Sequence, residues 1–149
     1  MADLLDDMAA HLVASGVTIG GSAVALWNGS TGTIFLARMP DSATEPDAVI
    51  SLYEENGSAP LETMGRDTVP IIERPRLTAL VRGAPSEYIE PRAVATLVWR
   101  ALAKIGNETV NGTFYQRVAP MNSVAPYEVD SSDRWTFWCN FDVMRAVAA

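Results

Sequence analysis

Hydrophobic and polar positions are most regularly patterned between Glu73 and Ile105. Over Pro75–Gly83 they alternate with a period of two, which predicts a β-strand. Over Pro91–Ile105 the apolar residues recur every three or four positions, which predicts an amphipathic helix that ends at a Gly106-Asn107 cap. The apolar stripe of this helix comprises Val94, Leu97, Val98, Ala101, Leu102 and Ile105. Because burying a large aliphatic side chain contributes about 1.5–3 kcal/mol, we expect this strand and helix to form the central scaffold.

Similar patterns predict one further helix and several further strands. Leu4, Met8 and Leu12 lie four residues apart, which predicts a helix over Ala2–Ala14. The segment Arg134–Val143 alternates apolar and polar residues along its whole length, which predicts a central strand. The remaining strands are expected at Thr33–Arg38, Ala48–Glu54 and Thr113–Ala119.

The segments between these elements are expected to be loops and turns. Val17–Thr33 is rich in glycine but lacks the lysine and the strand–loop–helix context of a phosphate-binding loop, so we expect a loop or a short strand around Ala23–Trp27. Pro120–Asp133 is expected to be a connection, and Asn111-Gly112 is a strong turn dipeptide, although the strand before it is short. The element order predicts a single domain, residues 1–149, of the α+β class. We expect a mixed, mainly antiparallel sheet with two helices packed on it.

The segment Glu55–Ile72 is expected to be a long loop, because it combines glycine, proline and scattered apolar residues. Loops of this length are unusual in small domains and tend to be functional or to contact a partner. Its apolar residues, which show no clear period, are Leu61, Met64, Val69, Ile71 and Ile72. Two interpretations remain open: a partner covers some of these residues, or they cap the core of the domain itself.

Composition excludes several classes of protein. The chain has 149 residues, a net charge of −7 and a pI near 4.6, which argues against a nucleic-acid-binding surface. A single cysteine excludes an internal disulfide and a multi-cysteine metal site. The N-terminus has neither the basic start nor the apolar run of a signal peptide, and no apolar run approaches the length of a membrane span. We therefore expect a cytosolic protein that does not associate with a membrane.

Residues capable of catalysis are few and scattered. Cys139 lies on the apolar face of the last predicted strand, so we expect a small buried hydrophobe rather than a nucleophile. His11 lies beside the stripe of the first helix, has no second His or Cys with which to hold a metal, and is expected to be exposed or at the edge of the core. HExxH, GxSxG and Walker motifs do not occur. We expect no enzymatic activity, metal or cofactor.

Some charged groups lie close together in the sequence. Two carboxylate pairs could in principle share protons, but solvated surface charge is favoured for both: Glu54 with Glu55, and Glu87 with Glu90. Arg74 and Arg76 flank Pro75 and could clamp an anion. Ion pairing across an interface, or to neighbours such as Glu73, is favoured for these two arginines.

Two segments carry a resemblance to a known family. Arg74–Gly83 has the pattern RP-x-L-x-x-L-V-R-G, and Arg134–Val143 has the pattern R-x-x-F-x-x-N-F-x-V. With the N-terminal amphipathic helix, a helix that begins near Tyr88 and an N-G-T-F-Y strand, they resemble the tail terminator proteins of long-tailed phages, also described as minor capsid proteins. The resemblance covers nearly the whole chain apart from Val17–Thr33 and Glu55–Ile72, and its motifs are structural rather than catalytic.

The resemblance implies a virion protein, assembled in the host cytoplasm, that forms a hexameric ring at the head-proximal end of the tail tube. Such a ring stops tube growth and docks the head connector. The implied partners are therefore further copies of this chain, the major tail tube protein and the head-tail connector or stopper. Six copies would carry a net charge of about −42, so DNA is expected to pass through the lumen without specific binding. The residues expected at the assembly interface are Leu61, Met64, Arg66, Val69, Ile71, Arg74 and Arg76.

Two other classes of function remain as alternatives. Another neck component, a head-tail stopper or adaptor, would share the size, the acidity and the lack of catalytic residues. An enzyme or small-ligand-binding α+β domain would need a deep polar pocket with converging carboxylates, which the sequence does not predict.

Overall fold

The computed structural model describes residues 3–61 and 72–146. They form the helices α1 (Leu4–Ala14) and α2 (Ile89–Ala103) and nine strands. The strands are β1 (Thr18–Ile19), β2 (Ser22–Ala23), β3 (Ile34–Leu36), β4 (Val49–Leu61), β5 (Ile72–Arg82), β6 (Gly106–Val110), β7 (Thr113–Pro120), β8 (Ala125–Val129) and β9 (Trp135–Ala146). In these two ranges, no helix is long and apolar enough to cross a membrane.

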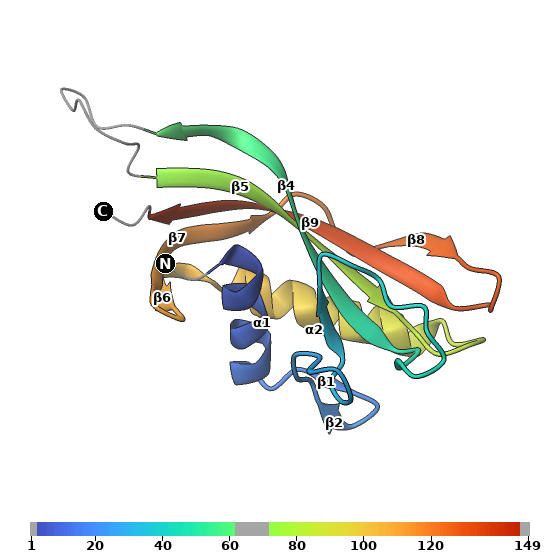
Figure 1. Ribbon diagram of the computed structural model, residues 1–149. Coiled ribbons are helices and arrows are strands. Elements are labelled where there is room, and N and C mark those ends of the chain that lie inside the picture. The colour runs from blue at the N-terminus through green and yellow to red at the C-terminus, as the bar shows by residue number, and fades with distance from the viewer. Residues whose placement is uncertain (1–2, 62–71, 147–149) are drawn as a thin grey trace.

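Seven strands form one sheet in the order β3-β4-β5-β9-β7-β6, with β8 also paired to β9 (Figure 1). β3 is parallel to β4, whereas the other neighbours in this sheet are antiparallel. β7 and β8 pair with successive parts of β9, residues 141–145 and 135–138, along the edge opposite β5. Both helices lie on one side of the sheet, which we call the inner face; the opposite side is the outer face (Figure 1). The α+β class and the mixed, mainly antiparallel sheet are confirmed.

The core lies between the inner face and the two helices. Leu77, Ala79 and Val81 of β5 are at most 1% exposed, and the alternate residues of β9 from Phe137 to Val143 are fully buried. The helices cover them with apolar stripes whose central residues are Leu4, Met8, Leu12, Val94, Val98 and Leu102. The central last strand and the two amphipathic helices are therefore confirmed.

The buried stripe of α2 is rotated relative to the predicted stripe. Leu97 is 43% exposed, whereas Ala95 is 1% exposed and takes part in the core. Val98 lies at the centre of the buried face, and Leu97, about 100° away around the helix, lies at its border. The expectation that Leu97 faces the core is wrong, because the small Ala95 lets the helix lie close to the sheet on its other side.

Left-handed backbone conformations mark two turns that the sequence suggested. Asn111 and Gly112 have φ angles of 50° and 90°, as a type I′ turn requires, and they join β6 to β7 in a hairpin. Asn107 also has a positive φ of 50° shortly after α2. Gly106, expected to share the helix cap, is instead the first residue of β6.

β4 and β5 are longer than the sequence periodicity predicts. β4 continues to Leu61 and β5 begins at Ile72, so the prediction of one loop over Glu55–Ile72 is wrong at both of its ends. Register shifts between Glu55 and Ser58 and between Ser58 and Leu61 interrupt the pairing of the two strands. Bulges of this kind remove the period-two pattern by which a strand is recognised.

Two of the expected connections contain short strands. β8 lies within Pro120–Asp133, where Pro126 and a register shift weaken the sequence signal. The β1–β2 hairpin lies within Val17–Thr33. Around Ala23–Trp27 the chain is mostly irregular and makes an isolated bridge from Leu26 to Ile34.

Candidate assembly site

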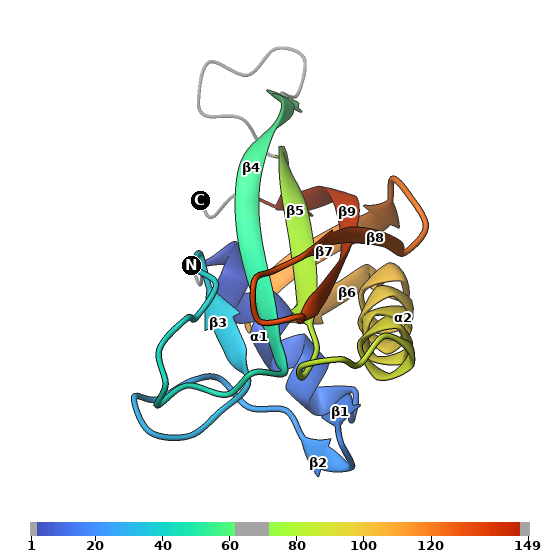
Figure 2. The same ribbon diagram turned by 90° about the vertical axis from the view of Figure 1, so that its right-hand side faces the viewer.

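The distal part of the β4–β5 hairpin extends beyond the helices (Figure 2). We call residues 54–61 of β4 and 72–76 of β5 the arm. Residues 54–61 are all exposed, and β3 pairs with β4 only at Ile50–Leu52. Among the described residues, no strand therefore covers the outer edge of β4 in the arm. Such an edge is a common place for contact with another chain.

Three residues expected at the assembly interface lie in the arm. Leu61 is 38% exposed, Arg76 is half-buried, and Arg74 donates from Nε to a carbonyl oxygen across the hairpin at 2.8 Å. Glu73, the expected ion-pair partner of these arginines, instead binds Arg145 at 2.8 Å. The expectation of local pairing to Glu73 is therefore wrong. The other expected interface residues lie outside the described ranges: Met64, Arg66, Val69 and Ile71.

The two strands of the arm approach each other closely at Gly57. A Cβ atom at this position would lie 1.8 Å from the carbonyl oxygen of Arg74. This is far inside van der Waals contact, so any side chain would push the bulged β4 away from β5. The shape of the arm thus depends on a glycine at this position.

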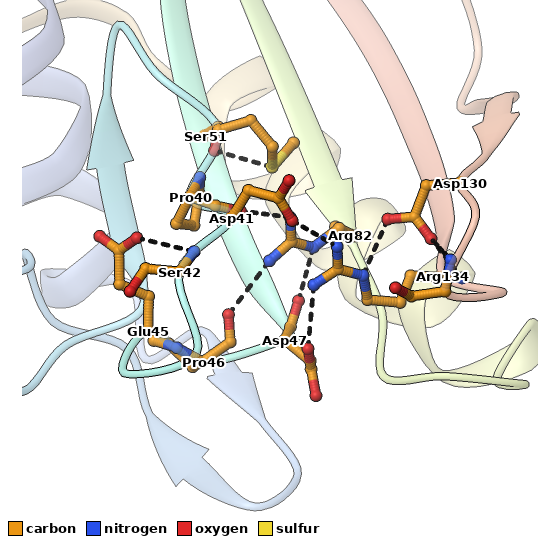
Figure 3. A network of polar contacts seen from close by, with 12 residues as sticks. Pro40, Asp41, Ser42, Glu45, Pro46, Asp47, Ser51, Arg82, Asp130 and Arg134 are labelled. Atoms are coloured by element: carbon orange, nitrogen blue, oxygen red, sulfur yellow. Dashed lines mark hydrogen bonds and ion pairs between the residues drawn. The ribbon is translucent and has the colours of Figure 1, made fainter.

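At the opposite end of the sheet, Arg82 holds the segment between β3 and β4 (Figure 3). Its guanidinium group donates to the carbonyl oxygens of Asp47 (2.8 Å), Pro40 (2.5 Å) and Pro46 (3.1 Å). Burial lowers the pKa of Arg82, and the positive charge of Arg134 lowers it further. One side chain therefore supplies donors to three carbonyl groups of an irregular segment.

Arg134 ties the same segment to the turn between β8 and β9 (Figure 3). Its Nε donates to Asp130 at 2.8 Å, Nη1 to Asp47 at 2.9 Å and Nη2 to Asp41 at 2.9 Å. Burial opposes the charge of Arg134, but hydrogen bonds to the three aspartates outweigh it and raise its pKa. Burial also opposes ionisation of Asp130, but hydrogen bonds from the backbone and side chain of Arg134 lower its pKa overall.

The two motif segments form neighbouring strands. Arg74–Gly83 includes most of β5 and Arg134–Val143 includes most of β9, and Arg82 lies opposite Thr136 in their antiparallel register. Gly83 follows β5 where a Cβ atom would meet the ring of Pro91 at 2.6 Å. The motif positions thus serve strand pairing, close packing and the anchoring of the segment around residues 40–47.

The outer face carries an open hollow of about 510 Å³ between β4 and β8. Its apolar and acidic lining includes Tyr53, Leu80, Tyr127, Trp138, Glu55 and Glu128. We call it the outer hollow. The rings of Tyr127 and Trp138 meet edge to face with their centroids 6.3 Å apart, and Tyr127 is 57% exposed. Aromatic side chains that are partly exposed in this way are enriched at protein interfaces.

A buried polar cluster joins α1 to the β6–β7 hairpin. Asp7 is fully buried and accepts hydrogen bonds from the hydroxyl of Tyr115 at 2.5 Å and from Nδ2 of Asn111 at 3.2 Å. Burial and then the carboxylate of Asp7 raise the pKa of Tyr115, so the phenol remains protonated. The sequence pattern did not distinguish this buried aspartate from its exposed neighbour Asp6.

The residues considered for catalysis lie apart from one another. Cys139 is fully buried, and burial raises the pKa of its thiol to about 12, so it is the small buried hydrophobe expected. His11 is partly buried, with Nε2 2.9 Å from the carbonyl oxygen of Ala101, as expected for the edge of the core. Both candidate carboxylate pairs are exposed. Among the residues that the structure describes, no group of three His, Cys, Asp or Glu side chains could hold a metal ion.

Comparison with known proteins adds a likeness in fold. A scan against protein-family models finds no match, and a search of curated protein sequences finds none. Among solved structures, the chain is similar to a chain of the "Virion of native gene transfer agent (GTA) particle". The TM-score is 0.51 at 13% sequence identity, over 77% of this chain and 79% of that chain. At this identity the likeness shows a shared fold.

Proposed function

We propose that this chain is a structural protein of a phage-like particle, and that it acts there as a tail terminator. In this role a ring of copies, six by the family resemblance, caps the head-proximal end of the tail tube and receives the head connector. The observation that carries the proposal is the likeness in fold, over about three quarters of both chains, to a protein of a gene transfer agent virion. The strand pair β5–β9 supports it, because the segments with terminator-like motifs form its centre.

The arm supports the same proposal by its position and exposure. A ring that ends a tube needs two lateral patches for the neighbouring copies, one surface for the tube and one for the neck. Leu61, Arg74 and Arg76 lie on an extension whose outer strand edge is not paired with any described strand, and such an edge is available for contact with another protein. We propose the arm as one of these contact surfaces, together with its sequence neighbours Met64, Arg66, Val69 and Ile71. The proposed partners are further copies, the tail tube protein and the head connector.

The role of the ring in DNA passage follows from its charge. With a net charge of −7 for each copy, a ring repels the phosphate backbone of DNA more than it attracts it. DNA would pass through the lumen without specific contacts. The protein acts in this proposal by geometry and contact, with no chemical step.

The proposal is tested with the purified protein and isolated tail tubes, imaged by electron microscopy. We expect rings, either free or on one end of each tube, and tubes of uncontrolled length when the gene is deleted. A protein that stays monomeric and never binds tube ends, or a deletion that leaves normal tails on normal heads, would refute the proposal. Rings located in the neck but away from the tube end would indicate a stopper or adaptor instead.

A matched pair of variants tests the arm. Leu61→Ser removes an exposed apolar side chain from the arm, and Val13→Ser removes one of similar exposure (47%) from α1. We expect Leu61→Ser to lose binding to tube ends or to neighbouring copies, with unchanged unfolding by urea, and Val13→Ser to assemble normally. The reverse result would place the contact on α1 rather than on the arm.

A further inference from the structure

The exposed side of α2 is basic, although the whole chain is acidic. Arg92 and Arg100 are eight residues apart on α2, and Lys104 follows Arg100 by four residues, directly after the helix, so all three project from one side. All three are exposed, and none forms an ion pair with any residue in the described ranges. Glu90, in the first turn, is also exposed but leaves this side basic overall. Beside the three cations, Ile89 is 80% exposed and Leu97 is 43% exposed. We call these five residues the helix patch: two apolar side chains with three unpaired cations.

The outer hollow is complementary to the helix patch, because it combines apolar side chains with negative charges. Its lining combines apolar and aromatic side chains with two carboxylates and a hydrogen-bonded polar pair: Leu80, Tyr53, Tyr127 and Trp138, then Glu55 and Glu128, then Thr78 and Asn140. Asp142 follows on the same side of β9 and is also exposed. Arg76 lies opposite both Glu55 and Asp142 in the register and is half-buried, so one cation stands against the three carboxylates and this part of the outer face is acidic overall.

The helix patch and the outer hollow lie on opposite faces of the sheet, since α2 covers the inner face (Figure 1). Two copies related by a two-fold axis would bring like patches together, and here that would oppose like charges. A head-to-tail contact instead brings unlike patches together, and it leaves each copy one free patch for the next copy. This is the arrangement from which rings are built.

We propose that the helix patch of one copy docks into the outer hollow of the next copy. The inference rests on the proposed ring and names its lateral contact. A second copy is favoured over nucleic acid, because Ile89 and Leu97 would stay exposed against a phosphate backbone but are covered by the aromatic side chains of the hollow. The charges of the helix patch and of the outer hollow set the orientation and make association sensitive to salt.

The test uses two charge-reversed variants of the full chain. The first, Arg92→Glu with Arg100→Glu, makes the helix patch acidic; the second, Glu55→Arg with Glu128→Arg, makes the outer hollow basic. In each variant alone, the helix patch of one copy meets an outer hollow of the same charge. We therefore expect self-association to weaken by at least about tenfold in sedimentation or native mass measurements. A control reversal outside both patches, Glu108→Arg on β6, should associate like the original chain. Circular dichroism and urea unfolding show that each variant is folded.

Mixing the two variants gives the decisive result. In an equimolar mixture an acidic helix meets a basic hollow and a basic helix meets an acidic hollow, so every contact is complementary again. We expect rings to return on mixing, with the two variants in equal numbers. If both variants assemble alone as the original chain does, or if mixing fails to rescue them, this contact is refuted while the ring proposal stands. If the original chain never associates, with or without tubes, the proposed function itself fails.

Discussion

Replacing Arg134 by methionine should destabilise the fold in a way that depends on pH. The variant keeps the apolar stem of the side chain but removes its bonds to Asp130, Asp47 and Asp41. The side chain of Asp130 is 29% exposed, so its charge-assisted bond is worth about 1–2 kcal/mol after allowance for solvent. The side chains of Asp47 and Asp41 are 52% and 85% exposed, and their pairs add together about 1 kcal/mol. We expect a loss of about 2–3 kcal/mol at pH 7.

The sign of the pH dependence follows from Asp130, whose pKa in the folded state lies below its ordinary value of 3.8. A carboxylate of this kind stabilises the folded state above its unfolded pKa, and the contribution disappears as the pH falls through the folded value. The difference in unfolding free energy between the original chain and Arg134→Met should therefore be full at pH 7 and shrink below about pH 4.

Urea unfolding followed by tryptophan fluorescence at pH 7 and at pH 3 provides the measurement. Arg100→Met is the matched control, because Arg100 is exposed on α2 and forms no ion pair with any described residue, so its replacement should leave the unfolding free energy unchanged. A difference of less than about 0.5 kcal/mol between Arg134→Met and the original chain at pH 7 would show that the three aspartate bonds do not stabilise the fold. A difference as large at pH 3 as at pH 7 would show that ionised Asp130 is not the cause.

Three further predictions concern the arm and the core. Tyr115→Phe leaves the buried carboxylate of Asp7 without its shortest donor and should cost about 1–3 kcal/mol in urea unfolding; a smaller cost would mean that water replaces the hydroxyl. Gly57→Ala places a Cβ against the Arg74 carbonyl, so hydrogen exchange should become faster in the arm and stay unchanged in β9; unchanged exchange throughout would contradict the close approach. Cys139 should react with a thiol reagent only as fast as the protein unfolds, whereas immediate labelling of the native protein would show an open path to the thiol.

Sequence periodicity predicted the parts of the fold where one face is buried and the other is not. Pro75–Gly83, Pro91–Ile105 and Arg134–Val143 correspond to β5, α2 and β9, although β5 begins earlier and β9 ends later than expected. Periodicity failed where burial is absent or the register changes. The β4 residues of the arm are exposed on both faces and bulged, so they carry no alternation, and β8 is exposed along most of its length.

The candidate site was less predictable than the fold. Arg82 and Arg134 could be recognised as positions in two motifs, but that both hold the segment around Asp47 depends on the order of the strands in the sheet. The outer hollow likewise combines residues of β4, β5, β8 and β9, and the sequence around each of them gives no sign that they lie together. The spacing of Arg92, Arg100 and Lys104 is enough to place the three cations on the exposed side of the predicted helix. Only the structure shows that the opposite face of the sheet is acidic.

The central position of β9, paired on both of its edges, affects how the chain folds during synthesis. β5, β7 and β8 all pair with β9, yet β9 follows every one of them in the sequence. During synthesis the edges of β5, β7 and β8 that pair with β9 therefore stay unpaired until the ribosome has delivered the segment from Trp135 onward, although β5 can already pair with β4 and β7 with β6. A chain interrupted before this point would lack the centre of the sheet. Completion of the sheet is therefore one of the last steps in the folding of this chain.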